Sequence, residues 1–216
     1  MQFLDHPVEL IVILFGLSLL PLFMVIGTCF LKISIVLSML RSAIGLPQVP
    51  PNVAIYALSL ILTAFVMAPV ASQVSKNLTE SPPDLSSPNA IANIDQKLYQ
   101  PYREFLTKQV DAKQVHFFLD IGHSIWKQDF ADQLNDQSLI VLMPAFAMSE
   151  INRAFKIVII LYLPFLVIDI LVTNILLSLG MMMVSPITIA LPIKILLFVV
   201  VDGWSKLLFQ LVMSYK

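Results

Sequence analysis

The chain has 216 residues, of which 58% are apolar and 12% are charged, with a formal net charge of -1. A soluble domain has about 25% charged residues, so this composition predicts a compact unit that meets lipid or other apolar protein over much of its surface. The near-neutral charge excludes a basic nucleic-acid surface. The single Cys29 excludes an intrachain disulfide and is expected to be a small buried hydrophobe. Three scattered histidines have no metal-binding spacing, and we expect no cofactor.

Two apolar segments occupy the first third of the chain. Residues 10–31 carry no charge and are long enough to span a bilayer core, which takes about 20 residues. Pro21 and Gly27 interrupt this segment, as membrane helices tolerate. Residues 32–52 are interpreted as a polar connection, and a second apolar segment is predicted at residues 53–71.

Residues 76–138 have a different character, with six basic and nine acidic residues. Three prolines predict a loop at residues 80–93. Apolar residues then recur at helical spacing in two sets, which are Ile94, Leu98, Tyr102 and Phe105, and then Val115, Phe118, Leu119, Gly122, Ile125 and Trp126. This pattern predicts a polar-faced insertion of two or three amphipathic helices. The distribution of basic residues favours an extracytoplasmic position for it.

Residues 157–179 and 187–212 form the third and fourth apolar segments. Four charged residues lie inside them: Asp169, Lys194, Asp202 and Lys206. A charge at the centre of a bilayer costs about 2.5–3.5 kcal/mol on insertion scales. We therefore expect this pair of segments to face protein rather than lipid.

The charges near these segments have several possible partners. Glu150 and Arg153 are three residues apart and share a helix face, and Asp202 and Lys206 are spaced for a local pair. Two interpretations remain open, which are solvated helix-surface charges and, favoured here, ion pairs between subunits of a buried assembly. The candidate residues are Glu150, Arg153, Asp169, Lys194, Asp202 and Lys206. One specific intersubunit contact, Glu150 with Lys194, is a hypothesis.

Three consecutive methionines separate the third and fourth segments. Met181, Met182 and Met183 lie between Gly180 and Pro186 with no charge nearby. Methionine side chains are unbranched and adapt their shape, so the loop is suited to a deformable seal, with Gly180 and Pro186 as its hinges. The alternative is that the methionines fill an irregular core.

Several motifs occur in an order that covers about two thirds of the chain. They are MLRSAIG at 39–45, QVPPN at 48–52, MAP at 67–69, LMPAF at 142–146 with SE at 149–150, YLPFLVID at 162–169, LGMMMVSP at 179–186, LPIK at 191–194 and VDGW at 201–204. Together they resemble the FliP/SctR family, the core export-gate subunits of bacterial type III secretion systems and flagella. We expect no cleavable signal peptide, because the residues before Leu10 include two acidic and no basic ones. The resemblance implies such a peptide for flagellar members, so the injectisome branch is favoured.

The resemblance implies an all-α fold in which apolar hairpins, 1–75 and 139–216, flank the extracytoplasmic insertion 76–138. It implies a pentameric ring or cone at the bacterial inner membrane, largely on the periplasmic side. Expected partners are two smaller apolar subunits (SctS-like and SctT-like), the large export-gate subunit, membrane lipid and unfolded secretion substrates, without nucleic acid. The methionines would line the central constriction as a gasket.

Two other function classes remain as alternatives. A small-solute transporter or channel subunit would use Asp169 with Asn174 or Lys194, although 216 residues without a visible repeat is small for a transporter. An enzyme would need catalytic motifs, and neither HExxH, GxSxG nor a phosphate-binding glycine loop occurs in the sequence. We therefore expect no enzymatic activity.

Overall fold

The computed structural model describes residues 7–46, 48–80 and 99–216, and the regular elements in these ranges are helices. In chain order they are α1 (Pro7–Ile26), α2 (Phe30–Ile44), α3 (Asn52–Glu80), α5 (Gln100–Gln109), α6 (Ala112–Ile125), α7 (Gln128–Ala131), α8 (Leu139–Ser178), α9 (Pro186–Val200) and α10 (Gly203–Met213). The predicted all-α fold is confirmed. The loop expected at 80–93, and Ile94 and Leu98, lie outside the described residues.

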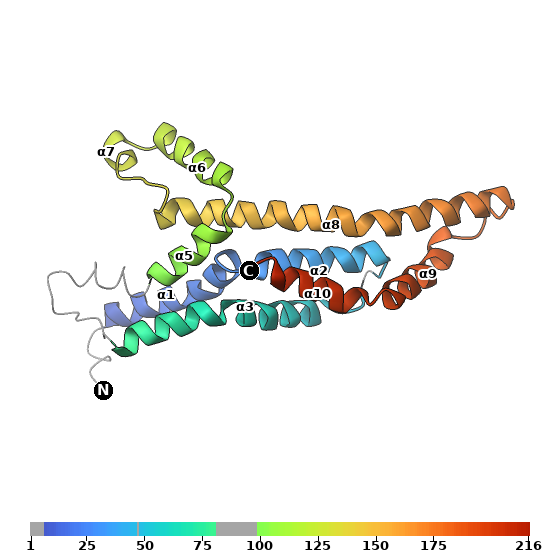
Figure 1. Cartoon of the computed structure of the whole chain (residues 1–216), viewed down its shortest axis with the longest axis horizontal. Coiled ribbons are helices and arrows are strands. Elements are labelled where there is room, and N and C mark those ends of the chain that lie inside the picture. The colour runs from blue at the N-terminus through green and yellow to red at the C-terminus, as the bar shows by residue number, and fades with distance from the viewer. Residues whose placement is uncertain (1–6, 47, 81–98) are drawn as a thin grey trace.

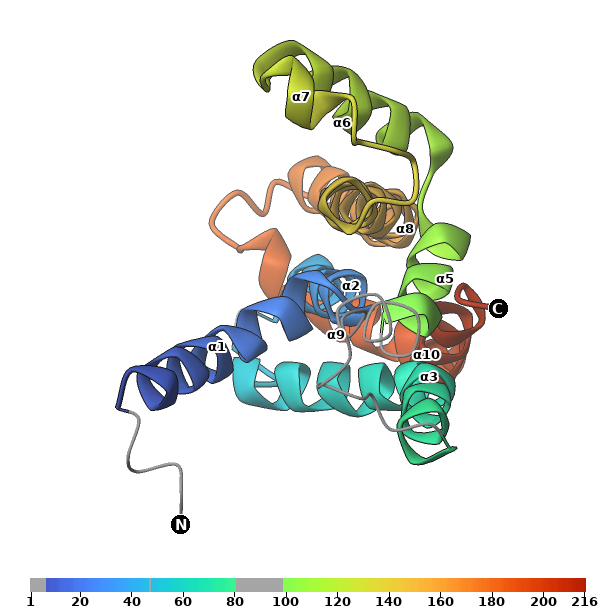
Figure 2. The ribbon, with the colours of Figure 1, turned by 90° about the vertical axis from the view of Figure 1, so that its left-hand side faces the viewer.

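The 40-residue helix α8 runs along the long axis of the molecule (Figure 1). At a rise of about 1.5 Å per residue it is roughly 60 Å long. Helix α2 lies between α8 and α3, as the end view also shows (Figure 2). The insertion helices α5, α6 and α7 lie at the amino-terminal end of α8, and the turn into α9 lies at its opposite end (Figure 1).

The first apolar segment is two helices and not one. Helices α1 and α2 meet at a bend of 59° around Gly27. The hydroxyl of Tyr102, on α5, donates a hydrogen bond to the carbonyl oxygen of Gly27 at 2.7 Å. A Cβ at residue 27 would overlap that hydroxyl, so the absence of a side chain lets the insertion pack against the bend.

The prediction of a polar connection at residues 32–52 is wrong, because helix α2 occupies most of it. Ile33, Val36, Leu37 and Leu40 are 0–1% exposed and form the centre of the main core. Their spacing places them on one helix face. Gly45 ends the helix at φ +96°, a left-handed conformation that glycine adopts without strain.

The prediction of one continuous fourth segment is also wrong. Helices α9 and α10 meet at a bend of 62°. Asp202 adopts φ +52° at the break, and Gly203 contacts the ring of Phe198 so closely that a Cβ would overlap it. The chain therefore turns where a small residue allows the α9 and α10 segments to pack together.

From residue 99 onward, where the structure describes it, the insertion contains the helices α5, α6 and α7, and its core lies against the amino-terminal half of α8. Leu106, Val115, Leu142 and Phe146 are buried together there. Helix α3 is longer than the predicted 53–71 and continues to Glu80. The amphipathic pattern thus predicted the existence of the insertion helices, while the extension of α3 was missed because its last turns are polar.

Among the residues that the structure describes, two helices, α3 and α8, are long and apolar enough to cross a membrane, and the number rises to as many as four if each bent pair counts as one span. Only 17% of the most apolar 18-residue window of each of these two helices is buried within the chain. Large apolar side chains therefore face outward, which is typical of a membrane protein or of a subunit buried in an assembly.

Candidate functional site: a methionine tip and two ion-pair clusters

The methionine loop begins with a hydrogen-bonded helix end. After α8 ends at Ser178, Gly180 adopts φ +71°. The Gly180 N–H donates to the carbonyl oxygen of Leu177 at 3.1 Å, and the Met181 N–H donates to that of Leu176 at 2.9 Å. These two bonds form a Schellman motif, in which a glycine in the left-handed conformation closes the helix. Gly180 therefore has a structural reason to be glycine, and its role as a hinge stays a prediction.

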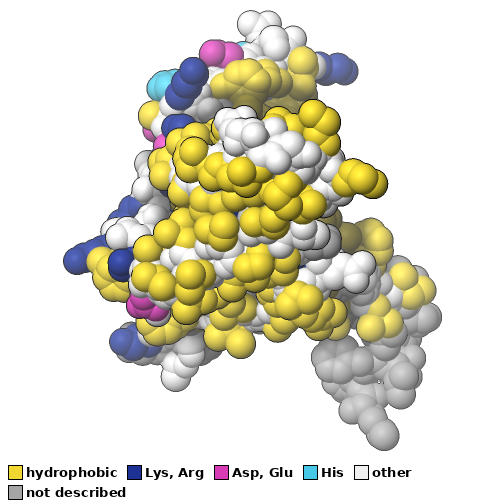
Figure 3. All heavy atoms as spheres, turned by 90° about the vertical axis from the view of Figure 1, so that its right-hand side faces the viewer, with side chains coloured by type: hydrophobic (Ala, Val, Ile, Leu, Met, Phe, Trp, Pro, Cys, Tyr) yellow, Lys and Arg dark blue, Asp and Glu magenta, His cyan; other side chains and the backbone are white. Residues whose placement is uncertain are grey.

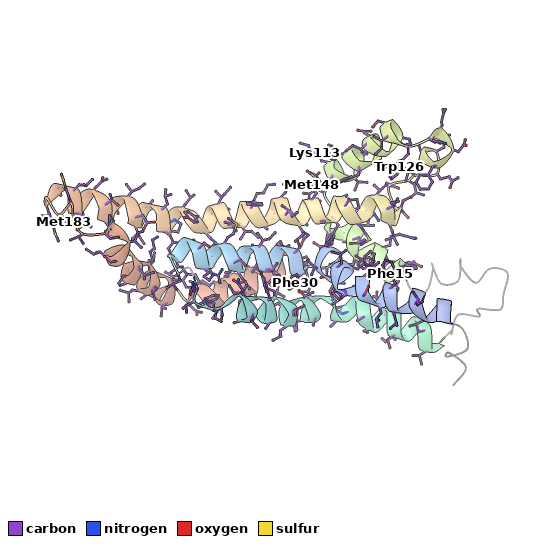
Figure 4. The ribbon with its side chains drawn as sticks, turned by 180° about the vertical axis from the view of Figure 1, so that it is seen from behind. Phe15, Phe30, Lys113, Trp126, Met148 and Met183 are labelled. Atoms are coloured by element: carbon purple, nitrogen blue, oxygen red, sulfur yellow. The ribbon has the colours of Figure 1, made fainter. Side chains whose placement is uncertain are left out.

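The three methionines project from the tip of the molecule. Met181 is 42% exposed, Met182 80% and Met183 100%, and Figure 4 shows Met183 at the extreme end, away from the insertion. Val184, the next residue, packs with the buried Leu176 and Ala190 below the tip. The loop is thus anchored at its base and leaves three flexible apolar side chains free. The alternative that they fill a core within this chain is wrong.

Pro186 fixes the other side of the loop. It is the first residue of α9, where its missing N–H costs no helical hydrogen bond and its restricted φ suits the helix. Ser185 precedes it in an extended conformation. The loop from Gly180 to Ser185 is therefore bounded by two defined helix ends.

A first ion-pair cluster, the buried cluster, consists of Lys32, Asp111, Glu150, Arg153 and Tyr215. Lys32 and Glu150 are 0% exposed, and their Nζ and Oε1 atoms are 3.4 Å apart. The Tyr215 hydroxyl donates a hydrogen bond to Glu150 Oε2. The Lys32 Nζ also lies 3.6 Å from the centroid of the Tyr215 ring, a cation–π geometry. Each buried charge therefore has partners of complementary polarity.

Arg153 connects the buried cluster to the insertion. Its guanidinium lies 2.7 Å from Asp111 Oδ1 and 3.6 Å from Glu150 Oε1. Asp111 lies between α5 and α6, and its N–H donates to Ser149 Oγ at 3.0 Å. The cluster thus joins α2, α8, the insertion and the last residues of the sequence. Burial and the negative charge of Glu150 raise the pKa of Tyr215 above its ordinary range.

A second ion pair lies nearer to the methionine tip. Lys194 of α9 is buried and donates to Asp169 Oδ2 of α8 at 2.6 Å and to the carbonyl oxygen of Ala43 at 3.2 Å. Ala43 lies in the last turn of α2, where carbonyl oxygens lack helical partners and a cation is favourable. One lysine therefore joins α8, α9 and the end of α2.

Four of the six charges predicted from the sequence form ion pairs inside the chain: Glu150, Arg153, Asp169 and Lys194. Glu150 and Arg153 pair as their spacing predicted. Among the described residues no ion pair joins Asp202 and Lys206, because Asp202 accepts a hydrogen bond from Ser205 instead. The intersubunit pairing of Glu150 with Lys194 stays a prediction. The sequence did not indicate Lys32, Asp111 or Tyr215, since Lys32 and Glu150 are 118 positions apart and no local pattern links them.

The surface around the methionine tip is mostly apolar. Seen from that end, hydrophobic side chains cover most of the face, and the Lys and Arg side chains lie toward its edges (Figure 3). On α8 the exposed residues include Ile160, Leu163, Leu171 and Ile175, each more than half exposed. The site is therefore a flexible apolar tip on an apolar hairpin, held by buried ion pairs, and the described residues contain no group of three metal-ligating side chains.

The sequence of the chain matches known proteins over nearly its whole length. The model of the FliP family matches residues 13–211. The Yop proteins translocation protein R of Yersinia pestis is 45% identical over 212 residues, covering 98% of both chains. The virulence protein YscR of Salmonella typhimurium gives the same identity and coverage. The harpin secretion protein HrcR of Erwinia amylovora is 42% identical over 209 residues, covering 97% of this chain and 96% of that protein.

Proposed function

The chain belongs to the FliP family, and on that premise we propose that it is a pore-forming core subunit of a type III secretion export gate. In this role it admits unfolded proteins to a path across the bacterial inner membrane and catalyses no reaction. The names of its relatives, which refer to Yop translocation and harpin secretion, favour an injectisome. A flagellar export gate of the same family is the alternative.

The observation that carries the proposal is the exposure of the methionine tip. Three apolar side chains that are 42%, 80% and 100% exposed are unfavourable in water unless other molecules cover them. A ring of several copies, five by analogy with the family, would bring the tips to one axis. Each tip would then cover its neighbours, with the hairpins as the wall of a cone.

Such a ring closes by exclusion of water. A narrow apolar constriction dewets, so ions do not pass. Thioether side chains change rotamer without breaking a specific bond, so an unfolded chain that enters the constriction displaces them. The Schellman motif at Gly180 and the start of α9 at Pro186 hold the ends of each loop while its side chains move. Closure and passage therefore use the same side chains.

The assembly would be completed by partners that cover the outward apolar faces. We propose two smaller apolar subunits of the export gate around the ring and the large export-gate subunit at its entrance. With the insertion on the periplasmic side, the division at residues 1–75, 76–138 and 139–216 corresponds to hairpin, insertion and hairpin. The long apolar helices α3 and α8 support a location in or next to the inner membrane.

The test is the simultaneous replacement of Met181, Met182 and Met183 by alanine. The assembled gate should then conduct ions while native mass spectrometry still shows the complete ring with its partners. Met148→Ala is the matched control, because Met148 lies on the same hairpin near the insertion, far from Met183 (Figure 4), and is 37% exposed. An ion-tight triple variant would refute the gasket, and a chain that forms no ring with any partner would refute the export-gate role.

A small-solute transporter is the second candidate, for one structural reason. Asp169 and Lys194 line a pocket of about 520 Å³ together with Tyr162 and Ser42. Their mutual ion pair satisfies both charges within the chain, which leaves less charge for a substrate. A transporter works without partners, so solute uptake by the purified chain in liposomes would favour this candidate.

A further inference from the structure

An open apolar groove lies between the second half of α8 and the bend from α9 to α10. Its volume is about 680 Å³, and the side chains that line it include Ile157, Ile160, Leu161, Phe165, Leu197 and Leu207. Two polar side chains at this groove, Lys206 and Gln210, come from α10. The groove is therefore shaped for a flexible hydrocarbon chain and carries a cation at its edge.

A basic pocket adjoins this groove. Lys108, Arg153, Lys156 and Ser214 line it, and Ile157 lines both the pocket and the groove. Arg153 is already paired with Asp111 and Glu150. Lys108, Lys156 and Lys216, which also lines the pocket, are exposed and form no ion pair with the part of the chain that the structure describes. The pocket therefore has three cations available to an external anion.

The pocket lies where the sequence of α8 changes from charged to apolar. From residue 157 to the end of α8 at Ser178 there are 22 residues, or about 33 Å at 1.5 Å per residue, and the one charge among them, Asp169, is neutralised by Lys194. The hydrocarbon core of a bilayer is about 30 Å thick. Lys156 therefore lies where a headgroup layer would meet this apolar stretch, and the groove extends from there toward the hydrocarbon.

We propose that the pocket and the groove together bind one anionic phospholipid, with its phosphate between Lys108 and Lys156 and an acyl chain in the groove. The unpaired lysines favour a net negative headgroup over a zwitterionic one. Continuity with the groove favours a lipid over a free phosphate, because a small anion gains nothing from apolar side chains beside it. This site goes beyond the export role and does not depend on it.

The test is lipid titration of the full chain in a neutral detergent, followed by native mass spectrometry. Phosphatidylglycerol is compared with phosphatidylcholine of the same acyl chains. The double variant Lys108→Gln with Lys156→Gln should weaken phosphatidylglycerol binding about fivefold for each charge removed, or roughly 25-fold. The control Lys76→Gln with Lys113→Gln removes the same charge from exposed positions outside the pocket and should leave binding unchanged. Circular dichroism verifies that both variants are helical.

Each outcome of the lipid titration supports or overturns the proposed phospholipid site. Preferential binding of phosphatidylglycerol that the double variant loses and the control variant retains supports the site. Equal binding of both lipids would overturn it, since the lipid would then be a nonspecific layer. Displacement of the lipid by inorganic phosphate or glycerol phosphate at similar concentration would overturn it in favour of a free anion. Loss of lipid whenever copies of the chain associate would overturn it in favour of a second copy on this face.

Discussion

Replacement of Glu150 by glutamine tests whether the buried cluster holds the hairpins together. Glu150 is 0% exposed and has three partners: Lys32 at 3.4 Å, Arg153 at 3.6 Å and the hydroxyl of Tyr215. Glutamine preserves the size of the side chain and an acceptor for Tyr215. It removes the charge that compensates Lys32, which is itself 0% exposed. The variant therefore isolates the electrostatic contribution.

The expected cost follows from the burial of both charges. Removing one partner of a buried ion pair leaves the other charge uncompensated and costs about 3–5 kcal/mol. The Tyr215 ring, 3.6 Å from Lys32 Nζ, offsets a part of this, so we expect Glu150→Gln to lower the free energy of unfolding by about 3 kcal/mol. Lys32→Met should cost about 2 kcal/mol, because Glu150 retains Arg153 and Tyr215.

A double-mutant cycle separates the pair from the general effect of each substitution. The double variant Lys32→Met with Glu150→Gln has no uncompensated buried charge at these two positions. It should therefore cost about 2 kcal/mol less than the two single changes added together. Unfolding by denaturant in a mild detergent, followed by far-ultraviolet circular dichroism, measures all four free energies.

Asp111→Asn is the matched control, because it breaks an ion pair of the same cluster at the surface. The side chains of Arg153 and Asp111 are 29% and 40% exposed, and such pairs contribute about 0.2–1 kcal/mol. If Glu150→Gln costs no more than Asp111→Asn, or if the two single effects simply add in the double variant, the buried pair does not stabilise the fold and the reasoning is refuted.

Three further predictions concern other contacts of the structure. Gly27→Ala should lower the free energy of unfolding by about 2 kcal/mol, because the added Cβ would clash with the Tyr102 hydroxyl. Adding Tyr102→Phe to this variant should recover part of the loss in thermal unfolding, and no recovery would contradict the clash. Gly180→Ala should lower the free energy of unfolding by about 1 kcal/mol, because φ is +71° although an added Cβ would meet no atom within 4 Å. Amide hydrogen exchange should become faster only at the end of α8, and destabilisation of the whole chain would show another cause. Burial raises the pKa of Tyr102 to about 12 from an unfolded value of about 10. The neutral phenol is therefore favoured in the fold, and stability present below about pH 10 should fall by up to about 3 kcal/mol toward about pH 12. An equal fall in Tyr102→Phe would refute this assignment.

The sequence alone was sufficient for the helical class and for the long apolar segments. Uninterrupted apolar runs predicted α3 over residues 53–71 and the second half of α8 from residue 157, while the first half of α8 was missed. The spacing of Val115, Phe118 and Gly122 predicted α6. These signals are local, because helix periodicity and hydrophobicity act within a few turns. Cys29, expected to be buried, is 0% exposed.

Helix α2 shows how a correct pattern was missed. Ile33, Val36, Leu37 and Leu40 have helical spacing in the sequence and are buried in the structure. The segment was interpreted as a polar connection because it begins at Lys32 and contains Arg41, Gly45 and three prolines, and a lysine in an apolar chain normally marks a boundary with water. Its partner Glu150 is 118 positions away. The burial of Lys32 depends on that distant carboxylate, so the neighbouring residues in the sequence do not predict it.

The candidate site, too, was predicted from the sequence only in part. The sequence by itself determined that an uncharged apolar loop follows the third apolar segment, because three methionines lie there between a glycine and a proline, which end and begin helices. Only the tertiary structure decided that this loop forms an exposed tip, that Lys194 pairs with Asp169 beside the end of α2, and that α9 turns into α10 at Gly203. The physical reason is that composition and periodicity are properties of neighbouring residues, whereas exposure, ion pairing and bends depend on which distant segments pack together.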